Sequence, residues 1–525
     1  MKNKTLLLFS VFFFYSFITY AQAGILDSSF ANNGIATYFG FEFNNSTSSA
    51  MQTDGKIIFS GLSNQDCAVT RFLSSGIPDS SFGTNGISIH KMNQINATET
   101  VAECALQPDG KIVVAGATKQ WNGTDYFWDV AVLRFNSDGS IDNSFGYNGK
   151  FATDISDNLD YETKAMKIQP DGKILITGYF SSSFGPSDVF LIRLNTEGSP
   201  DSEFGLNGIV KTNVDPILND VPEEIALQPG GKILVTGAQN YYLFSIRYLS
   251  NGSIDGAFGI DGITKTDFSD YTSDWLSARS IAITQDGKVL IGVNFSNGED
   301  VDVMILQYTS EGILDSSFGN DGTIIYSSPD AFEFCSSIII QPDGRIILAG
   351  VRGESYNQYP DQLLLLRYEN SGLVDESFGV NGITTTSIGF STGCNGAIIN
   401  NEGKIILTGS TQLSQGSEVG CLIARYTTGL NVGIHDLNVD KLNVHVYPNP
   451  LSDQSIIEFS IQKNSETTIN LVDLYGRKIK IIAAGKFSEG NHSLPISGNG
   501  LVSGIYFIEL ECGREVAFEK VVINK

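Results

Sequence analysis

Acidic side chains are the residues of this chain that could carry out hydrolysis. Five glutamates lie near the expected starts of short strands. Pairs of carboxyl groups act as acid and base, or as acid and nucleophile, in enzymes that cleave glycosidic bonds. Solvated acidic loops would explain the same glutamates equally well. The five residues are Glu99, Glu162, Glu223, Glu224 and Glu333.

Histidine and cysteine are too sparse for other common reaction types. Of four histidines, only His90 lies in the repeated region, which excludes a histidine cluster for zinc or copper and a nucleophile–base arrangement there. The six cysteines form no Cys-x-x-Cys pair, and we expect buried free thiols rather than disulfides. No Asp-x-Asp-x-Asp-Gly loop occurs, so only the acidic composition suggests calcium, and we predict no cofactor or metal. Whether the chain is an enzyme stays open, with catalysis as the weaker alternative.

Aromatic side chains offer a second kind of chemistry, which is recognition through exposed rings. All three tryptophans and several tyrosines lie in segments whose length varies between repeat units. Aromatic residues on variable loops over a rigid scaffold favour binding of glycan or protein, although the rings could instead pack long loops against the core. The candidate ligand-binding residues are Trp121, Tyr126, Trp128, Tyr179, Tyr241, Trp275 and Tyr356.

These residues are set within a motif that recurs seven times between residues 27 and 426. It comprises Asp-x-x-Phe-x-x-x-Gly, a turn that is usually Asp-Gly-Lys, an apolar run ending in glycine, and an apolar run ending in arginine and an aromatic residue. The position of the repeated arginine, which Gln307 fills in the fifth unit, lies eight residues before the next aspartate, as in Arg71 and Asp79. We predict that the recurring residues are structural, and they include Asp79, Phe82, Asp142, Phe145, Asp201, Phe204, Asp315 and Phe318.

Each unit contains four strand candidates, which in the second unit cover residues 86–91, 101–107, 111–116 and 130–135. Pro108-Asp109-Gly110 predicts a tight hairpin turn, because proline presets φ and glycine accepts a positive φ. Four short antiparallel strands in each of seven units predict an all-β fold with a seven-bladed β-propeller. A parallel solenoid fits less well, because its coils are shorter.

The repeated side chains suggest how the units are joined. We expect the phenylalanine to pack between adjacent sheets, and the aspartate and arginine to pair across a corner. Arg425 has no aspartate eight residues later, and Asp27 has no arginine before it. We therefore predict that Arg425 meets Asp27 and closes the ring.

Connection lengths predict two different faces. In a blade of four antiparallel strands, alternate connections emerge on the same face. The Asp-Gly-Lys turn and the Asp-x-x-Phe corner, whose lengths are fixed, therefore share one face. Both variable connections share the other face, and we expect all three tryptophans there.

The repeat resembles the bacterial delta-60 repeat family over about 400 residues, as in Ile141-Asp142-Asn143-Ser144-Phe145-Gly146 and Leu106-Gln107-Pro108-Asp109-Gly110-Lys111. Ala31, Gly230, Glu402 and Arg345 depart from its usual residues. The resemblance implies a propeller-like domain on a secreted or surface protein and brings no established chemistry with it.

The chain ends predict export. Lys2 and Lys4 precede an apolar run, and Ala21 and Ala23 offer cleavage sites, so we predict a signal peptide over 1–21 and a propeller over 24–426. A linker over 427–443 leads to alternating apolar runs that predict a small β-sandwich over 444–525. No other segment could cross a membrane.

The sandwich region resembles the type A C-terminal sorting domain of the type IX secretion system of Bacteroidetes. The resemblance rests on Tyr447-Pro448-Asn449-Pro450, Asp473-Leu474-Tyr475-Gly476-Arg477, Gly504-Ile505-Tyr506 and a basic end. It implies that this region engages the type IX secretion machinery and that the protein is secreted or lies at the cell surface.

The formal charge of −25 argues against nucleic acid as a partner, since phosphates require clustered cations. We therefore expect an exported propeller that binds glycan or protein without catalysis. The alternatives are a carbohydrate-active hydrolase or lyase that uses loop carboxylates, and a structural spacer in a surface layer or in adhesion.

Overall fold

The computed structural model describes residues 23–429 and 444–523, except 41–42, 93–97, 122–124, 154–158, 183–184, 272–274, 297, 299, 330, 355–359, 448, 452–454, 462, 473–477, 502–503 and 513–514. The expected signal peptide, most of the expected linker, Tyr356, Pro448 and the Asp473–Arg477 motif lie outside the described residues. The chain divides into two compact units, residues 1–432 and 433–525.

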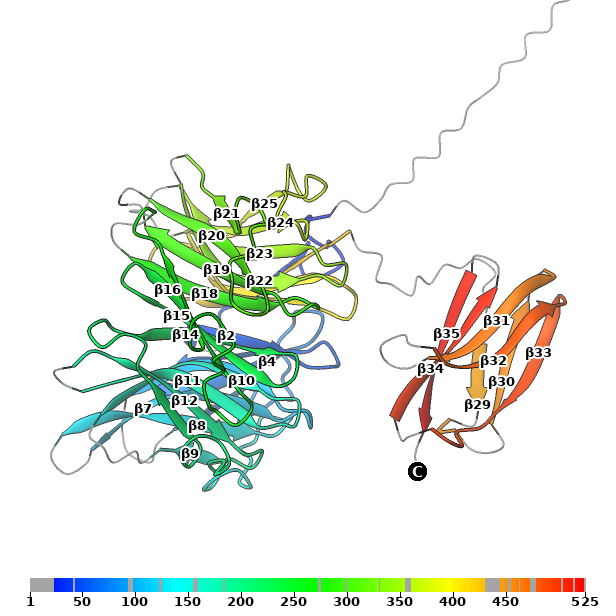
Figure 1. Cartoon of the computed structure of the whole chain (residues 1–525), viewed down its shortest axis with the longest axis horizontal. Helices are drawn as coiled ribbons and strands as arrows, with labels where there is room; N and C mark the ends of the chain where they lie inside the picture. The colour runs from blue at the N-terminus through cyan, green and yellow to red at the C-terminus, as the bar shows by residue number, and fades with distance from the viewer. Residues whose placement is uncertain are drawn as a thin grey trace, which may run out of the picture. The chain divides into compact units, whose positions relative to one another are not determined.

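Within residues 23–429 the described strands form seven four-stranded antiparallel sheets, which are the blades of the predicted propeller (Figure 1). Blade 1 contains β2 (Phe43–Met51), β3 (Ile57–Ser63), β4 (Asp66–Phe72) and β5 (Ile87–His90); blade 2 contains β6 (Glu99–Leu106), β7 (Ile112–Trp121), β8 (Tyr126–Phe135) and β9 (Lys150–Ala152). Blade 3 contains β10 (Asp160–Ile168), β11 (Ile174–Ser181), β12 (Asp188–Leu194) and β13 (Ile209–Thr212); blade 4 contains β14 (Val221–Gln228), β15 (Lys232–Gln239), β16 (Tyr242–Tyr248) and β17 (Ile263–Asp267). Blade 5 contains β18 (Leu276–Ile283), β19 (Val289–Ser296), β20 (Val301–Tyr308) and β21 (Thr323–Tyr326); blade 6 contains β22 (Phe332–Ile340), β23 (Ile346–Gly353), β24 (Gln362–Tyr368) and β25 (Ile383–Ser387). Blade 7 contains β26 (Ser391–Ile399), β27 (Ile405–Gln412), β28 (Gly420–Tyr426) and β1 (Ile35–Tyr38).

The blades close into a ring. The first strand of each blade contacts the first strand of the next blade, from β2 and β6 through to β22 and β26, and β26 contacts β2 again. These seven strands are therefore the inner strands. Strand β1 pairs with β28, Ile35 opposite Ala424, so the two ends of the repeat region build blade 7 together.

The sequence repeat and the structural blade do not begin at the same strand. The four strands expected as one unit over residues 86–135 therefore belong to two blades, which corrects the prediction. The strand expected at 86–91 is β5, which pairs with β4 and is the outer strand of blade 1. The Asp-x-x-Phe corner causes this shift, because it folds the chain back onto the strand that precedes it.

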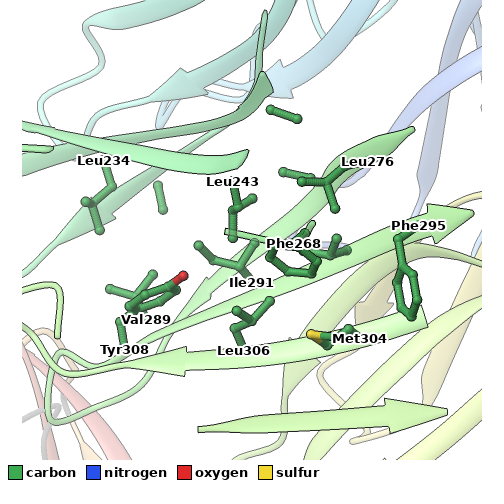
Figure 2. Packing of buried hydrophobic residues seen from close by; sticks show 14 of the residues in the cluster. Leu234, Leu243, Phe268, Leu276, Val289, Ile291, Phe295, Met304, Leu306 and Tyr308 are labelled. Carbon is green, nitrogen blue, oxygen red and sulfur yellow. The ribbon is translucent and has the colours of Figure 1, made fainter. Parts of the chain in front are cut away.

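The core lies between the blades. Strands β19 and β20 are buried along their whole length, consistent with apolar runs covered on both sides. Figure 2 shows one such layer, in which Leu234 and Leu243 of blade 4 face Ile291 and Leu306 of blade 5. Burying these apolar surfaces is the main stabilising contribution to the ring.

The two predicted faces are confirmed. Because successive strands of each blade pair antiparallel, the turn between β6 and β7 and the corner between β8 and β9 lie on one face, which we call the corner face. The β7–β8 connection and the segment before β6 lie on the opposite face, which we call the loop face. Trp121 ends β7, Trp128 lies near the start of β8, and Trp275 precedes β18, so all three tryptophans are at the loop face.

The C-terminal unit is the expected β-sandwich. One sheet has the order β29-β30-β33 and the other the order β32-β31-β34-β35. A separate core includes the buried side chains of Ile457, Ile469 and Ile508. The strands are β29 (Val444–Tyr447), β30 (Ser455–Ile461), β31 (Ser465–Val472), β32 (Lys478–Phe487), β33 (Gly490–Ile496), β34 (Gly504–Cys512) and β35 (Glu515–Ile523).

Candidate functional site

The repeated aspartate lies between two cations at the corner face. In blade 3, Asp201 Oδ2 accepts a hydrogen bond from Arg193 Nε at 2.7 Å and one from Lys173 Nζ at 2.8 Å. The lysine comes from the Asp-Gly-Lys turn. Sequence analysis missed this second partner, although the lysine recurs in step with the aspartate.

The same arginine also connects its blade to the next one. Arg193 donates to the carbonyl oxygen of Ser250 in blade 4, and its guanidinium lies 4.3 Å from the centre of the Phe204 ring. Phe204 in turn lies against Gly252 of blade 4, where a Cβ atom would come within 3.0 Å of the ring. We call this set of contacts the corner latch.

The predicted closure of the ring is confirmed. Arg425 Nε donates to Asp27 Oδ2 at 3.0 Å, and Lys404 Nζ lies 3.5 Å from the same oxygen. The guanidinium of Arg425 lies 4.7 Å from the centre of the Phe30 ring. Residues 398 positions apart therefore form the same arginine–aspartate pair as residues eight positions apart.

Blade 5 shows that the arginine of the corner latch can be replaced. Gln307 stands in place of the arginine, and Asp315 keeps Lys288 at 2.8 Å. The hydrogen bonds from Lys288 and Ser317 lower the pKa of Asp315 to about 2. For Asp201, burial alone would raise the pKa, but the hydrogen bonds from Lys173 and the Glu203 amide and the charge of Arg193 outweigh it and lower the pKa.

We expect Arg193→Gln to lower the free energy of unfolding by about 2 kcal/mol, because the bonds to Asp201 and Ser250 are lost while Lys173 still pairs with Asp201. Urea unfolding of the chain without its signal peptide measures this change. The matched control is Arg279→Gln at an exposed position, with an expected change within about 0.5 kcal/mol. Equal values for the two variants would contradict a role of Arg193 in joining the blades.

The five candidate catalytic glutamates each contact different neighbouring residues. Glu99 is buried and accepts hydrogen bonds from the amides of Met92 and Cys67 at 2.7 and 3.1 Å. Glu162 contacts Lys164 at 2.6 Å and accepts a hydrogen bond from the Tyr179 hydroxyl.

The remaining three glutamates lie on later inner strands. Glu223 accepts a hydrogen bond from Ser277 at 2.8 Å, and Glu224 lies 3.9 Å from Lys167. Glu333 is fully buried, with Arg352 Nε 3.4 Å from its Oε1. Within the described part of the chain, each of the five glutamates is thus engaged by a hydrogen-bond donor or a cation.

Glu333 makes the propeller sensitive to pH. Burial raises its pKa to about 7, against smaller opposing effects of Ser328 and Arg352. A raised carboxyl pKa means that the folded chain holds the proton more tightly than the unfolded chain, whose glutamate pKa is about 4.3. Stability contributed by the protonated form is therefore lost as pH rises from about 4.5 to about 7.

We expect Glu333→Gln to raise the free energy of unfolding at pH 8 by about 2 kcal/mol and to leave it nearly unchanged at pH 4.5. Thermal unfolding of both chains across this range checks the result. A difference that is constant with pH would show that titration of Glu333 is not its cause.

Three of the predicted ligand-binding aromatics form one cluster on the β7–β8 hairpin. The hairpin pairs Trp121 with Tyr126 and Lys119 with Trp128, so these four residues share one side of it. The centres of the Trp121 and Tyr126 rings lie 4.7 Å apart, and the two residues are 53% and 60% exposed. Lys119 Nζ lies 5.8 Å from the Tyr126 ring and 5.9 Å from the Trp128 ring. We call these four residues the hairpin cluster.

The other candidates do not join the hairpin cluster. Trp275 is half-buried, and its ring stacks on that of Phe334 in the next blade, with 6.2 Å between the ring centres. This contact holds the loop that contains Trp275 against the neighbouring blade. Tyr179 is held by Glu162, and Lys164 Nζ lies 5.4 Å from its ring. Tyr241 is exposed at the β15–β16 connection.

The cysteines are free, as expected. Four are buried and two, Cys394 and Cys512, are half-buried. Burial raises the pKa of the Cys335 thiol to about 12, which makes the group unreactive at neutral pH. Among the described residues, no three His, Cys, Asp or Glu side chains gather in a way that could hold a metal. In the same part of the chain, no helix has the length and apolar character needed to span a membrane.

Two families match the chain. Repeats described as a domain of unknown function (DUF5122) β-propeller match residues 52–82, 107–145, 169–204, 284–318 and 341–378. A secretion system C-terminal sorting domain matches residues 445–524. No curated protein matches the chain at a significant level.

Solved structures resemble the chain weakly. PorZ, a surface component of the type IX secretion system of Porphyromonas gingivalis, is 12% identical with a TM-score of 0.39, over 93% of this chain and 60% of its own. The polysaccharide lyase Uly1 is 12% identical with a TM-score of 0.44, over 78% of this chain and 98% of its own. A fungal alcohol oxidase of the AA5 family, in complex with copper, is 11% identical with a TM-score of 0.40, over 93% of this chain and 98% of its own. The chain thus spans 60% of the length of PorZ, and none of these likenesses carries a functional argument.

The sorting domain implies that the chain engages the type IX secretion machinery and is secreted or lies at the cell surface. The repeat matches fall on the corners and turns described above, and the sorting-domain match covers the C-terminal sandwich. The chain is thus made of β-propeller repeats of the DUF5122 family followed by a secretion system C-terminal sorting domain.

Proposed function

We propose that this exported propeller binds a glycan without catalysis, through the hairpin cluster of Lys119, Trp121, Tyr126 and Trp128. The observation that carries the proposal is the pair of half-exposed rings of Trp121 and Tyr126 on one side of a hairpin. A ring in the core is covered, whereas these two present apolar faces to solvent on a rigid scaffold.

The scaffold supports recognition at this place. Strands β7 and β8 have ten residues each and are the longest strands among the described residues of the propeller. Their paired ends hold the aromatic rings with little conformational freedom, so less entropy is lost when a ligand stacks on them. The ammonium of Lys119 beside two of the rings adds a hydrogen-bond donor for sugar hydroxyl or carboxyl groups.

We expect Trp121→Ala and Tyr126→Ala each to weaken binding of a glycan hit by about 10-fold or more, since a buried aromatic contact contributes at least about 1.4 kcal/mol. The measurement is a screen of the chain without its signal peptide on immobilised glycans, followed by titration of the hits. Trp275→Ala is the matched control, because Trp275 stacks on Phe334 instead of joining the hairpin cluster.

The screen also separates the alternatives. Equal loss of binding in Trp275→Ala would contradict the hairpin cluster as the site. Capture of a protein and of no glycan would assign the hairpin cluster to protein recognition. Release of reducing sugar that is lost in a Glu→Gln variant would favour a carbohydrate-active enzyme, and no response in any assay would favour a structural spacer.

A further inference from the structure

The corner of blade 7 is built from the two ends of the repeat region. In the other blades the same corner is one continuous stretch of chain. An intact corner runs from the arginine to the aspartate eight residues later, as from Arg134 to Asp142. In blade 7 the chain leaves this path after Thr428, three residues beyond Arg425. It resumes at Ala23, four residues before Asp27.

The split corner keeps the hydrogen bonds of an intact one. In blade 2, the Asn136 amide donates to Ser140 and the Gly139 amide donates to Asn136. In blade 7, the Thr427 amide donates to Ile25 at 2.9 Å, and the Gly24 amide donates to Thr427 at 2.7 Å. Thr427 and Gly24 therefore stand in the places of Asn136 and Gly139.

Ala23 supplies a contact between blades. The amide of Gly205 donates to the carbonyl oxygen of Asn251 in the next blade, and Gly319 donates to Ser371 in the same way. The equivalent amide of Gly379 in blade 6 donates to the carbonyl oxygen of Ala23 at 2.9 Å. Ala23 is buried, with its side chain in the apolar core between blades 6 and 7.

Gly24 supplies the packing contact that follows. Gly139 and Gly198 lie against the repeated phenylalanines Phe82 and Phe145, and Gly24 lies against Phe378. Gly24 has φ of +78°, and a Cβ atom there would come within 2.8 Å of the Gly379 nitrogen. Only glycine fits this place without strain.

We propose that the signal peptide is removed between Ala21 and Gln22, so that Ala23 and Gly24 are retained as the last pieces of the ring. The residues Ala21-Gln22-Ala23 match the small-x-small pattern that would direct cleavage after Ala23 instead. Cleavage there would remove the carbonyl that Gly379 needs. It would also place the new N-terminal ammonium on Gly24, which is buried.

The direct test is the N-terminal sequence and intact mass of the protein that the native host exports. We expect Gln22 as the first residue. A chain that starts at Gly24 would overturn the proposal.

A second test uses recombinant chains with defined N-termini at Gln22, Ala23 and Gly24, each continuing to Lys525. We expect the Gln22 chain to melt highest, because the Ala23 chain places its ammonium on a buried residue, and the Gly24 chain to melt at least about 3 °C below the Gln22 chain, or not to fold. Hydrogen exchange of the Gly379 amide is expected to be at least about 10-fold faster in the Gly24 chain, while the Gly319 amide, bonded to Ser371, stays protected. Equal melting and equal protection in all three chains would show that Ala23 does not close the ring.

Discussion

Gly116→Ala is expected to lower the free energy of unfolding by about 4 kcal/mol. Gly116 pairs with Val101 next to a β-bulge of the inner strand β6. A Cβ atom on Gly116 would lie 1.8 Å from the carbonyl oxygen of Thr100 and 2.8 Å from its carbon. These are backbone atoms of a paired strand, so no side-chain rotation relieves the clash.

Thermal and urea unfolding of the chain without its signal peptide measure this effect. Gly256→Ala is the matched control, because nothing lies within 4 Å of its Cβ position and its φ is not positive. We expect the control to change stability by at most about 0.5 kcal/mol. A Gly116→Ala chain as stable as the control would show that the inner strand shifts at little cost.

The equivalent position in blade 5 shows how local that constraint is. Val293 pairs with Ala278 where Gly116 pairs with Val101, so this blade accepts a side chain at the same register. The spacing of the repeat predicts a glycine at the position of Gly116 in each unit, and the sequence itself shows Val293 as the exception. Both blades have a register shift at this point of the inner strand, so the bulge alone does not decide whether a side chain fits. The bulge could not be predicted from spacing, because it depends on the pairing between two strands.

Sequence spacing predicted the features that depend on chain connectivity. The number of blades, the two faces and the pairing of Arg425 with Asp27 all follow from counting residues between repeated positions. The blade boundaries were wrong by one strand, because the spacing does not say whether residues 86–91 pair forward or backward along the chain.

Contacts between blades were beyond sequence analysis. The bond from Arg193 to the Ser250 carbonyl and the stacking of Trp275 on Phe334 join residues from neighbouring blades, and neither has a spacing that marks it. Trp121 and Tyr126 could be expected to meet, since a hairpin places them opposite each other. The separation of the candidate glutamates into unrelated contacts could not be predicted, because it depends on which inner strand each occupies.

The sorting domain can be tested apart from the propeller, because each unit has its own core. We expect deletion of residues 444–525 to abolish delivery of the propeller to the cell surface or the medium, and the truncated chain to accumulate inside the cell envelope. Fractionation of the native host, with detection of a tag in the propeller, measures the distribution. Delivery at the normal level would contradict a role of the sandwich in export.

Two substitutions determine whether the secretion machinery requires the folded sandwich. Ile508 is fully buried in its core, so Ile508→Asp leaves an unpaired charge there and is expected to unfold this unit and to stop delivery as the deletion does. Ile481 is 61% exposed on the edge strand β32, so Ile481→Asp introduces the same charge without disturbing the core. We expect Ile481→Asp to be delivered normally. Loss of delivery in Ile481→Asp with the sandwich still folded would instead identify the β32 edge as a surface that the machinery contacts, because unpaired edge strands readily accept a partner.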